Sequence, residues 1–92
     1  MNQNDNVNHP QHYKAANGLE AIDVIEAFTS DLSGFEATHT GNALKYLLRW
    51  KRKNGLEDLK KARWYLNRLI EKMEQRQKQF SISFEIKGNK EE

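Results

Sequence analysis

The sequence predicts an all-α protein, a three-helix domain with a long C-terminal helical hairpin, to which one C-terminal β-strand is added. Apolar residues recur at helical intervals over three segments, and each segment follows an Asn or Ser placed three residues before a Glu, the spacing of a capping box. Near the C-terminus a short run alternates apolar and polar side chains, which indicates a strand. With 92 residues the chain has room for one small domain.

The domain is expected to span residues 9–79, behind a flexible lead at 1–8 that is rich in asparagine and poor in apolar side chains. Pro10 holds the residue before it out of the helical region and so fixes a turn. A first helix over about 19–30 follows, with Asn17 as its cap.

The second helix is predicted to open at Ser33, to bend near Gly41 and to run to Lys53. Asn54-Gly55 ends it, because both residues tolerate the left-handed conformation. The third helix begins at once, and its apolar residues step by 3, 4, 3 and 4, a heptad seam. This seam, made of Leu59, Ala62, Leu66, Leu69 and Met73, suits either an antiparallel hairpin with the second helix or a helix of a second subunit.

Residues 80–87 carry the alternating pattern, and residues 88–92 form a polar end. A single strand has no partner within this chain, so it is either a disordered tail or paired with another molecule, and we expect it to pair between subunits. A chain of this size buries little surface when folded alone, which also favours a homo-oligomer.

Charge is unevenly distributed along the chain. Residues 1–44 carry 1 basic and 6 acidic side chains, residues 45–68 carry 9 and 2, and residues 69–92 carry 5 and 5. The absence of cysteine excludes disulfides and thiolate zinc sites, and no zinc, haem or flavin is expected. No apolar run is long enough to span a bilayer, so we expect a cytoplasmic protein without a membrane partner.

The basic middle segment predicts a phosphate site, because arginine forks and lysine point charges together suit phosphate groups. Aromatic side chains lie between these cations and suit stacking on a base, although packing between helices explains some of them equally well. The predicted phosphate ligands are Lys45, Arg49, Lys53 and Lys61, and the predicted stacking or site-closing residues are Tyr13, Tyr46 and Trp50.

Two carboxylates and a histidine complete the predicted site. Glu20 and Asp23 share a helical face and suit Mg²⁺, although a solvated acidic face is the simpler interpretation. His12, in the turn after Pro10, suits a catalytic acid or base or a contact that pins the N-terminal arm. His12, Glu20 and Asp23 are therefore the candidate catalytic residues. No P-loop or glycine-rich dinucleotide motif is present.

Three ordered motifs together resemble the small bacteriophage family called SaV-like, and a similar domain occurs in a coliphage nucleotide kinase. The motifs are Asn8-His9-Pro10-x-His12-Tyr13, Gly18-x-Glu20-Ala21-Ile22-Asp23, and Gly41-Asn42-Ala43-x-Lys45-Tyr46-x-x-Arg49-Trp50-x-x-Lys53-Asn54-Gly55-x-x-Asp58-Leu59-x-Lys61-Ala62. The resemblance covers about residues 8–70. It implies a phage origin and nucleotide handling, without assigning a role to any single motif position.

The sequence therefore predicts an oligomeric phage protein that binds a nucleotide, with phosphate transfer between nucleotides as its reaction if it is an enzyme. One alternative is a non-catalytic sink for nucleotides that counters host defence. A second alternative is a protein–protein module that acts on a host protein through the heptad seam and the tail. Nucleic-acid binding fits less well, because the N-terminal half of the chain is acidic.

Overall fold

The structure is a computed structural model that describes the backbone of residues 10–91 and the side chains of residues 10–82. The flexible lead expected at 1–8 lies outside the described residues. The described part is helical, which confirms the all-α prediction. Its elements are the short 3-10 helix η1 (Gln11–Tyr13), α2 (Ala21–Thr29), α3 (Gly34–Arg49), the 3-10 turn η2 (Trp50–Arg52) and α4 (Leu56–Glu91).

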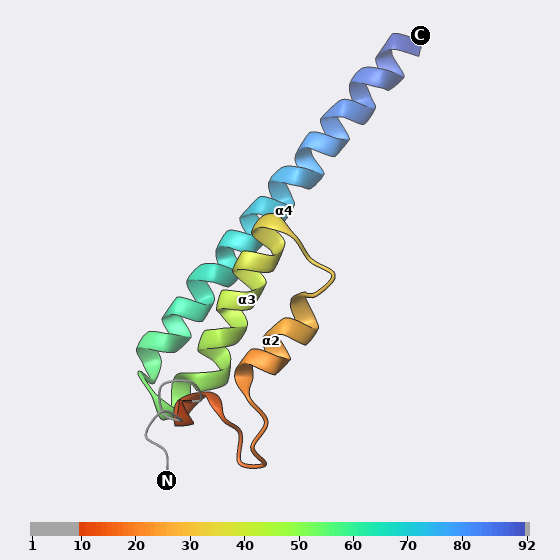
Figure 1. Ribbon diagram of the computed structural model, residues 1–92. Coiled ribbons are helices and arrows are strands. Elements are labelled where there is room, and N and C mark those ends of the chain that lie inside the picture. Colours follow the sequence, from red (N-terminus) through yellow and green to blue (C-terminus); the bar gives the residue numbers. More distant parts are fainter. Residues whose placement is uncertain (1–9, 92) are drawn as a thin grey trace.

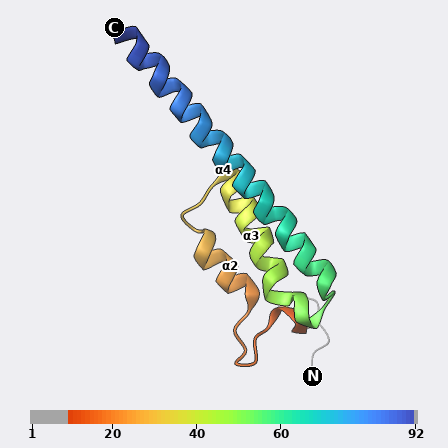
Figure 2. The ribbon, with the colours of Figure 1, turned by 180° about the vertical axis from the view of Figure 1, so that it is seen from behind.

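Helix α3 lies between the other two main helices (Figures 1 and 2). It runs antiparallel to the first half of α4, so the predicted helical hairpin is present within one chain, and it buries Ala62 of the heptad seam while Leu66 of that seam stays half exposed. Helix α2 packs on the other side of α3, and η1 lies at the end of α3 near the hairpin turn (Figure 1). The second half of α4 projects beyond the start of α3 (Figure 1).

Small residues mark the points where the helices touch. The buried apolar residues of the described chain are Ala21 on α2, Ala43 on α3 and Ala62 on α4. A Cβ atom added to Gly41 of α3 would lie 3.6 Å from Cγ2 of Ile25 on α2. Such small side chains let helix axes approach closely, but they bury little apolar area, so the core within one chain is thin.

The helix ends differ in detail from the sequence prediction. The first helix begins at Ala21, and the side chain of Asn17 instead accepts a hydrogen bond from the backbone N–H of Leu19 (3.1 Å), which makes a turn before the helix. Helix α3 passes through Gly41 as one continuous element. The hairpin turn uses Gly55 at φ 58°, in the left-handed region that glycine adopts without strain.

The strand expected at 80–87 is not confirmed, because α4 continues as a helix through these residues to Glu91. Extending an existing helix adds one hydrogen bond for each residue that is fixed, whereas a strand needs a neighbouring strand. The Glu, Lys and Gln residues around the alternating run are good helix formers and favour the same outcome. Within the described residues, no helix is long and apolar enough to cross a membrane.

Candidate functional site

A buried ion pair joins the two arms of the hairpin. Arg49, at the end of α3, donates from Nε to Oδ2 of Asp58 (3.1 Å) and from Nη2 to Oδ1 (3.2 Å). Asn54, in the turn between them, donates to Asp58 from its backbone N–H (3.3 Å) and from Nδ2 (3.1 Å). Asp58 is 0% exposed and Arg49 is 6% exposed. A bidentate pair of this kind fixes both the position and the plane of the guanidinium group.

The electrostatics of this pair keep both groups charged. Burial by itself would raise the pKa of Asp58, but the hydrogen bonds from Arg49 and Asn54 outweigh it and lower that pKa to about 2. Burial likewise opposes the charge on Arg49, and hydrogen bonds to Asp58 and Tyr13 raise its pKa above the usual value. The charge of Arg49 is therefore balanced within the protein.

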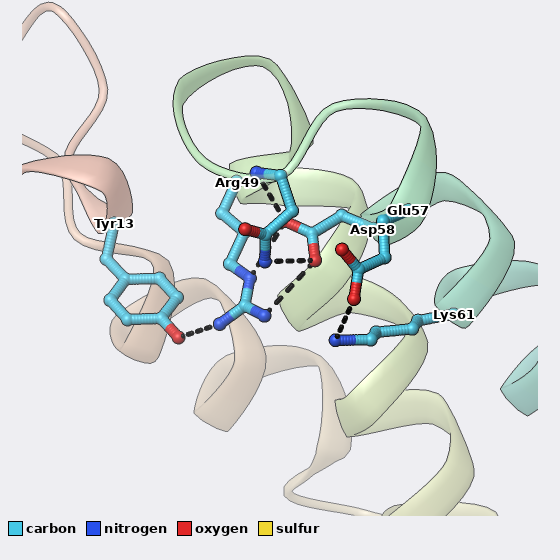
Figure 3. A network of polar contacts seen from close by, with 6 residues as sticks. Tyr13, Arg49, Glu57, Asp58 and Lys61 are labelled. Carbon is cyan, nitrogen blue, oxygen red and sulfur yellow. Dashed lines mark hydrogen bonds and ion pairs between the residues drawn. The ribbon is translucent and has the colours of Figure 1, made fainter.

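Residues of η1 close one side of the cluster. Nη1 of Arg49 donates to the hydroxyl oxygen of Tyr13 (2.6 Å), so the guanidinium lies between Tyr13 and Asp58 (Figure 3). The ring of His12 lies 4.3 Å from the ring of Tyr13. Burial and the positive charges of Lys53 and Arg49 lower the pKa of His12. His12 is therefore favoured as a neutral imidazole, beside cations.

Three cations from two helices surround the ring of Tyr46 on α3. The distances to the ring centroid are 4.6 Å from Lys45 Nζ, 4.6 Å from Arg49 Cζ and 5.6 Å from Lys61 Nζ. Lys61 also pairs at the surface with Glu57, at 3.2 Å (Figure 3). Among the described residues, Asp58 is the one buried carboxylate in this cluster. The cluster therefore carries more positive than buried negative charge.

Two hollows adjoin this cationic cluster. A cavity of about 270 Å³ lies between η1, α2 and α3, with Tyr13, Glu20, Ile25 and Lys45 in its wall. A shallower hollow of about 310 Å³ is lined by Tyr46, Lys61, Trp64 and Tyr65. The rings of Tyr46 and Tyr65 are stacked, with centroids 5.9 Å apart. Lys45 and Tyr46 are neighbours in the chain, so the cations lie close to both hollows.

The structure brings most of the predicted site residues together at the hairpin end of the molecule. The N-terminal part supplies His12 and Tyr13 from η1 and Glu20 from the position before α2. Helix α3 supplies Lys45, Tyr46 and Arg49, the turn after it supplies Lys53, and α4 supplies Lys61.

Two predicted residues lie apart from the cluster. Asp23 is exposed on α2 and is not in the wall of the cavity that Glu20 lines. The cation near the ring of Trp50 is Lys51, whose Nζ lies 5.8 Å from the ring centroid, and it is not one of the three cations around Tyr46. Among the side chains of residues 10–82, no three acidic or histidine groups gather as a metal site would require. The Mg²⁺ role of Glu20 and Asp23 stays a prediction.

Sequence reasoning missed the partner of Arg49 and the ring beside Tyr46. Asp58 was noted only as a motif position, although its place three residues after the Gly55 turn sets it opposite the end of α3. The stacking residues predicted from the sequence did not include Tyr65, whose ring lies beside Tyr46. The signal for Asp58 was its position, since an acid in the first turn of one hairpin arm faces the last turn of the other.

Comparison with known proteins places the chain among phage proteins. The family model described as "Protein of unknown function (DUF3310)" matches residues 7–67, which contain every predicted site residue. The "Gene 1.7 protein" of Enterobacteria phage T3 is 43% identical over 63 residues, an alignment that covers 64% of this chain and 38% of that protein. The chain thus spans less than half of that relative's length. No solved structure matches. The chain belongs to the DUF3310 family.

Proposed function

We propose that this protein binds a nucleotide, or a closely related phosphate ligand, at the cationic cluster around Tyr46. The phosphates are held by Lys45 and Lys61, with Lys53 at the edge of the site. Arg49 acts as a positioning residue, because each of its three side-chain nitrogens already donates to Asp58 or Tyr13 and the pair with Asp58 is buried. The lysines alone therefore hold the phosphates, whereas the sequence pattern predicted that Arg49 would hold them too.

The observation that carries the proposal is the surplus of cations around one aromatic ring. The Tyr46 ring attracts each of its neighbouring cations, but Lys45, Arg49 and Lys61, all within 5.6 Å of the ring centroid, still repel one another. Asp58 compensates one charge, and the exposed Glu57 compensates Lys61 only weakly because water screens that pair. Glu20 lines the same cavity as Lys45, and an anionic ligand would compensate the positive charge that these carboxylates leave.

The hollows beside the cluster suit the other half of a nucleotide. Binding sites for small molecules are commonly concave, largely apolar and about 300–1,000 Å³ in volume. The cavity near Tyr13 holds about 270 Å³ and the hollow beside Tyr65 about 310 Å³, so each suits a single small group. Trp64 and Tyr65 offer ring faces on which a base can stack, next to the Lys61 ammonium.

Sequence similarity points the same way. The motifs that resemble those of the SaV-like family, and of a domain in a coliphage nucleotide kinase, include Lys45, Tyr46, Arg49 and Lys61. Transfer of phosphate between nucleotides requires Mg²⁺ to neutralise developing charge, and Glu20 is the carboxylate in the wall of the cavity. Binding without catalysis needs the lysines alone, and it fits a nucleotide sink as well as a kinase.

The experiment is a thermal-shift panel of nucleoside mono-, di- and triphosphates on the full chain, with and without Mg²⁺. A ligand at 100 times its dissociation constant adds about 2.7 kcal/mol to the stability of the folded state. We expect a selective shift that Lys45→Ala and Lys61→Ala each reduce and that Lys60→Ala, one position away on the exposed side of α4, leaves unchanged. A shift that requires Mg²⁺ and is lost in Glu20→Gln would favour phosphate transfer over simple binding.

Other outcomes decide against this function. No shift with any nucleotide, in a protein whose circular dichroism shows it to be folded, would favour the protein–protein module that acts on a host protein. A shift with double-stranded DNA that falls steeply as salt rises would favour nucleic-acid binding instead.

A further inference from the structure

We propose that two copies of this chain pair through α4, antiparallel and around a two-fold axis, to supply the hydrophobic core that one copy lacks. The interface is the outer stripe of α4, which we define as Leu59, Leu66, Ile70, Met73 and Phe80. This pairing is independent of the nucleotide site.

The first observation is the amount of surface that the single chain leaves in water. On the described part of α4 alone, six large apolar side chains are between 46% and 72% exposed, namely Leu56, Trp64, Leu66, Ile70, Phe80 and Ile82. The buried apolar residues of the described chain are three alanines. Covering such side chains with a second copy is favourable, because burial of apolar surface is the main driving force of association.

The second observation is where the uncovered apolar surface lies. Ala62 and Arg76 are on the side of α4 that faces α3, since Ala62 is buried and Arg76 pairs with Glu36 of α3 at 2.9 Å. The outer stripe adjoins that side, and its members are spaced by 7, 4, 3 and 7 residues, which keeps them on one face of a helix. Leu66 is 49% exposed and Ile70 is 46% exposed.

The third observation is the overhang of α4. The Glu36–Arg76 pair lies near the start of α3, so the residues of α4 after Arg76 run past the end of their neighbour (Figures 1 and 2). Phe80, in this overhang, is 72% exposed. The overhang continues an existing helix, so its backbone hydrogen bonds form without a partner, but the apolar side chain of Phe80 stays in water until a second copy covers it.

A second copy fits because the stripe is complementary to itself. An antiparallel register centred between Leu69 and Ile70 sets Leu59 opposite the partner's Phe80, and Leu66 opposite the partner's Met73. Both contacts then occur twice, as two-fold symmetry requires. In this register residues 77–83 of the overhang lie along the first turns of the other α4, and the exposed Leu56 lies at the end of that contact.

Charges beside the stripe agree with the same register. Arg63 and Glu74 both flank the stripe on its solvent side, eleven residues apart and therefore about 16 Å apart along one helix. Within one copy they are too distant to pair. In the antiparallel register Arg63 approaches the partner's Glu74, and the same contact is repeated on the other side of the axis.

Sedimentation equilibrium of the full chain tests the pairing. We expect the wild type to have twice the monomer mass, and Leu66→Glu and Ile70→Glu to shift it to the monomer, because each places two charges in the interface. The control is Trp64→Glu, an equally drastic change at a 59% exposed position about 200° around α4 from Leu66, which should leave the dimer intact. A monomeric wild type, an assembly that both stripe variants leave unchanged, or equal dissociation by Trp64→Glu would overturn the proposal.

Charge reversal tests the register without touching the apolar stripe. Arg63→Glu and Glu74→Arg should each weaken the dimer, and the double variant should recover the affinity lost by either. Because the two residues do not meet within one copy, recovery can only come from a contact between copies. Additive weakening in the double variant would reject the antiparallel register, and circular dichroism of each variant verifies that the helices are intact.

Discussion

At the scale of single residues, the pair of Arg49 and Asp58 decides how the hairpin closes. The carboxylate accepts four hydrogen bonds, two from Arg49 and two from Asn54, so its charge is satisfied although water does not reach it. A buried ion pair contributes little net stability when compared with apolar residues, but removing one partner leaves an uncompensated charge and costs about 3–5 kcal/mol. The pair therefore specifies the geometry of the turn more than it adds stability.

Asp58→Asn tests this role. The substitution keeps the size of the side chain but leaves the buried Arg49 without its counter-charge. In a domain of this size each kcal/mol moves the midpoint of thermal unfolding by roughly 4–8 °C, so we expect a loss of more than about 10 °C. Glu57→Gln is the matched control, since its exposed pair with Lys61 is expected to change the midpoint very little. Equal effects of the two substitutions would contradict a buried, structural pair.

Acid unfolding provides a second test at the same residue. The pKa of Asp58 is about 2 in the folded chain and 3.8 as the reference value, so between these values the unfolded state binds more protons. The stabilising contribution of the carboxylate is therefore fully present above about pH 4 and is lost as pH falls towards 2. Urea unfolding of wild type and Asp58→Asn should give stabilities that differ at pH 6 and converge near pH 2. If the two stabilities differ as much at pH 2 as at pH 6, the effect of the substitution has a cause other than the charge of Asp58.

At the scale of helices, the sequence was sufficient where local signals agreed with one another. The heptad seam and the Asn54-Gly55 turn predicted the α3–α4 hairpin, which the structure contains. Helix starts were less predictable, because Asn17 caps a turn and not a helix. The tail was predicted as a strand because the alternation at 80–87 was considered without the helix that precedes it. Once α4 exists, extending it is easier than starting a strand with no neighbour.

The candidate site could be predicted only in its composition. Residue types and spacing selected Lys45, Tyr46 and Lys61, which do meet in space. The partner of Arg49 could not be chosen with certainty, because several acidic residues compete for it in the sequence and only the turn geometry brings Asp58 to it. Long-range contacts of this kind depend on the path of the chain and not on local pattern.

Two glycines should respond in opposite directions to the same substitution. Gly41 lies inside α3, and a Cβ there would meet Ile25 at 3.6 Å, an ordinary van der Waals contact. Gly41→Ala should therefore stabilise the protein by about 0.5–1 kcal/mol, because glycine is a poor helix former. Gly55 has φ of 58°, so Gly55→Ala should destabilise it by about 1–2 kcal/mol. Urea unfolding of both variants measures these changes in the free energy of unfolding. Destabilisation by Gly41→Ala would contradict the prediction and would mean that α2 and α3 leave no room for the added methyl group.

At the scale of the whole molecule, the thin core has a consequence for stability. The buried apolar residues of the described chain are three alanines, while leucines and isoleucines remain about half exposed. A single small core rarely supplies more than about 3–5 kcal/mol even when it is well packed. If α4 pairing supplies the rest, folding and association are linked, and the midpoint of thermal unfolding must depend on protein concentration.

We therefore expect the unfolding midpoint of the wild type to rise over a hundredfold increase in concentration, as mass action requires for a folded dimer that unfolds to two chains. Ile70→Glu should lower the midpoint and remove most of this dependence, because its folded state is a monomer. Trp64→Glu should keep the dependence, since its side chain lies away from the outer stripe. Calorimetry at several concentrations measures all three. A wild-type midpoint that does not move would mean that the exposed stripe is tolerated in water and that α4 of one copy is stable without another.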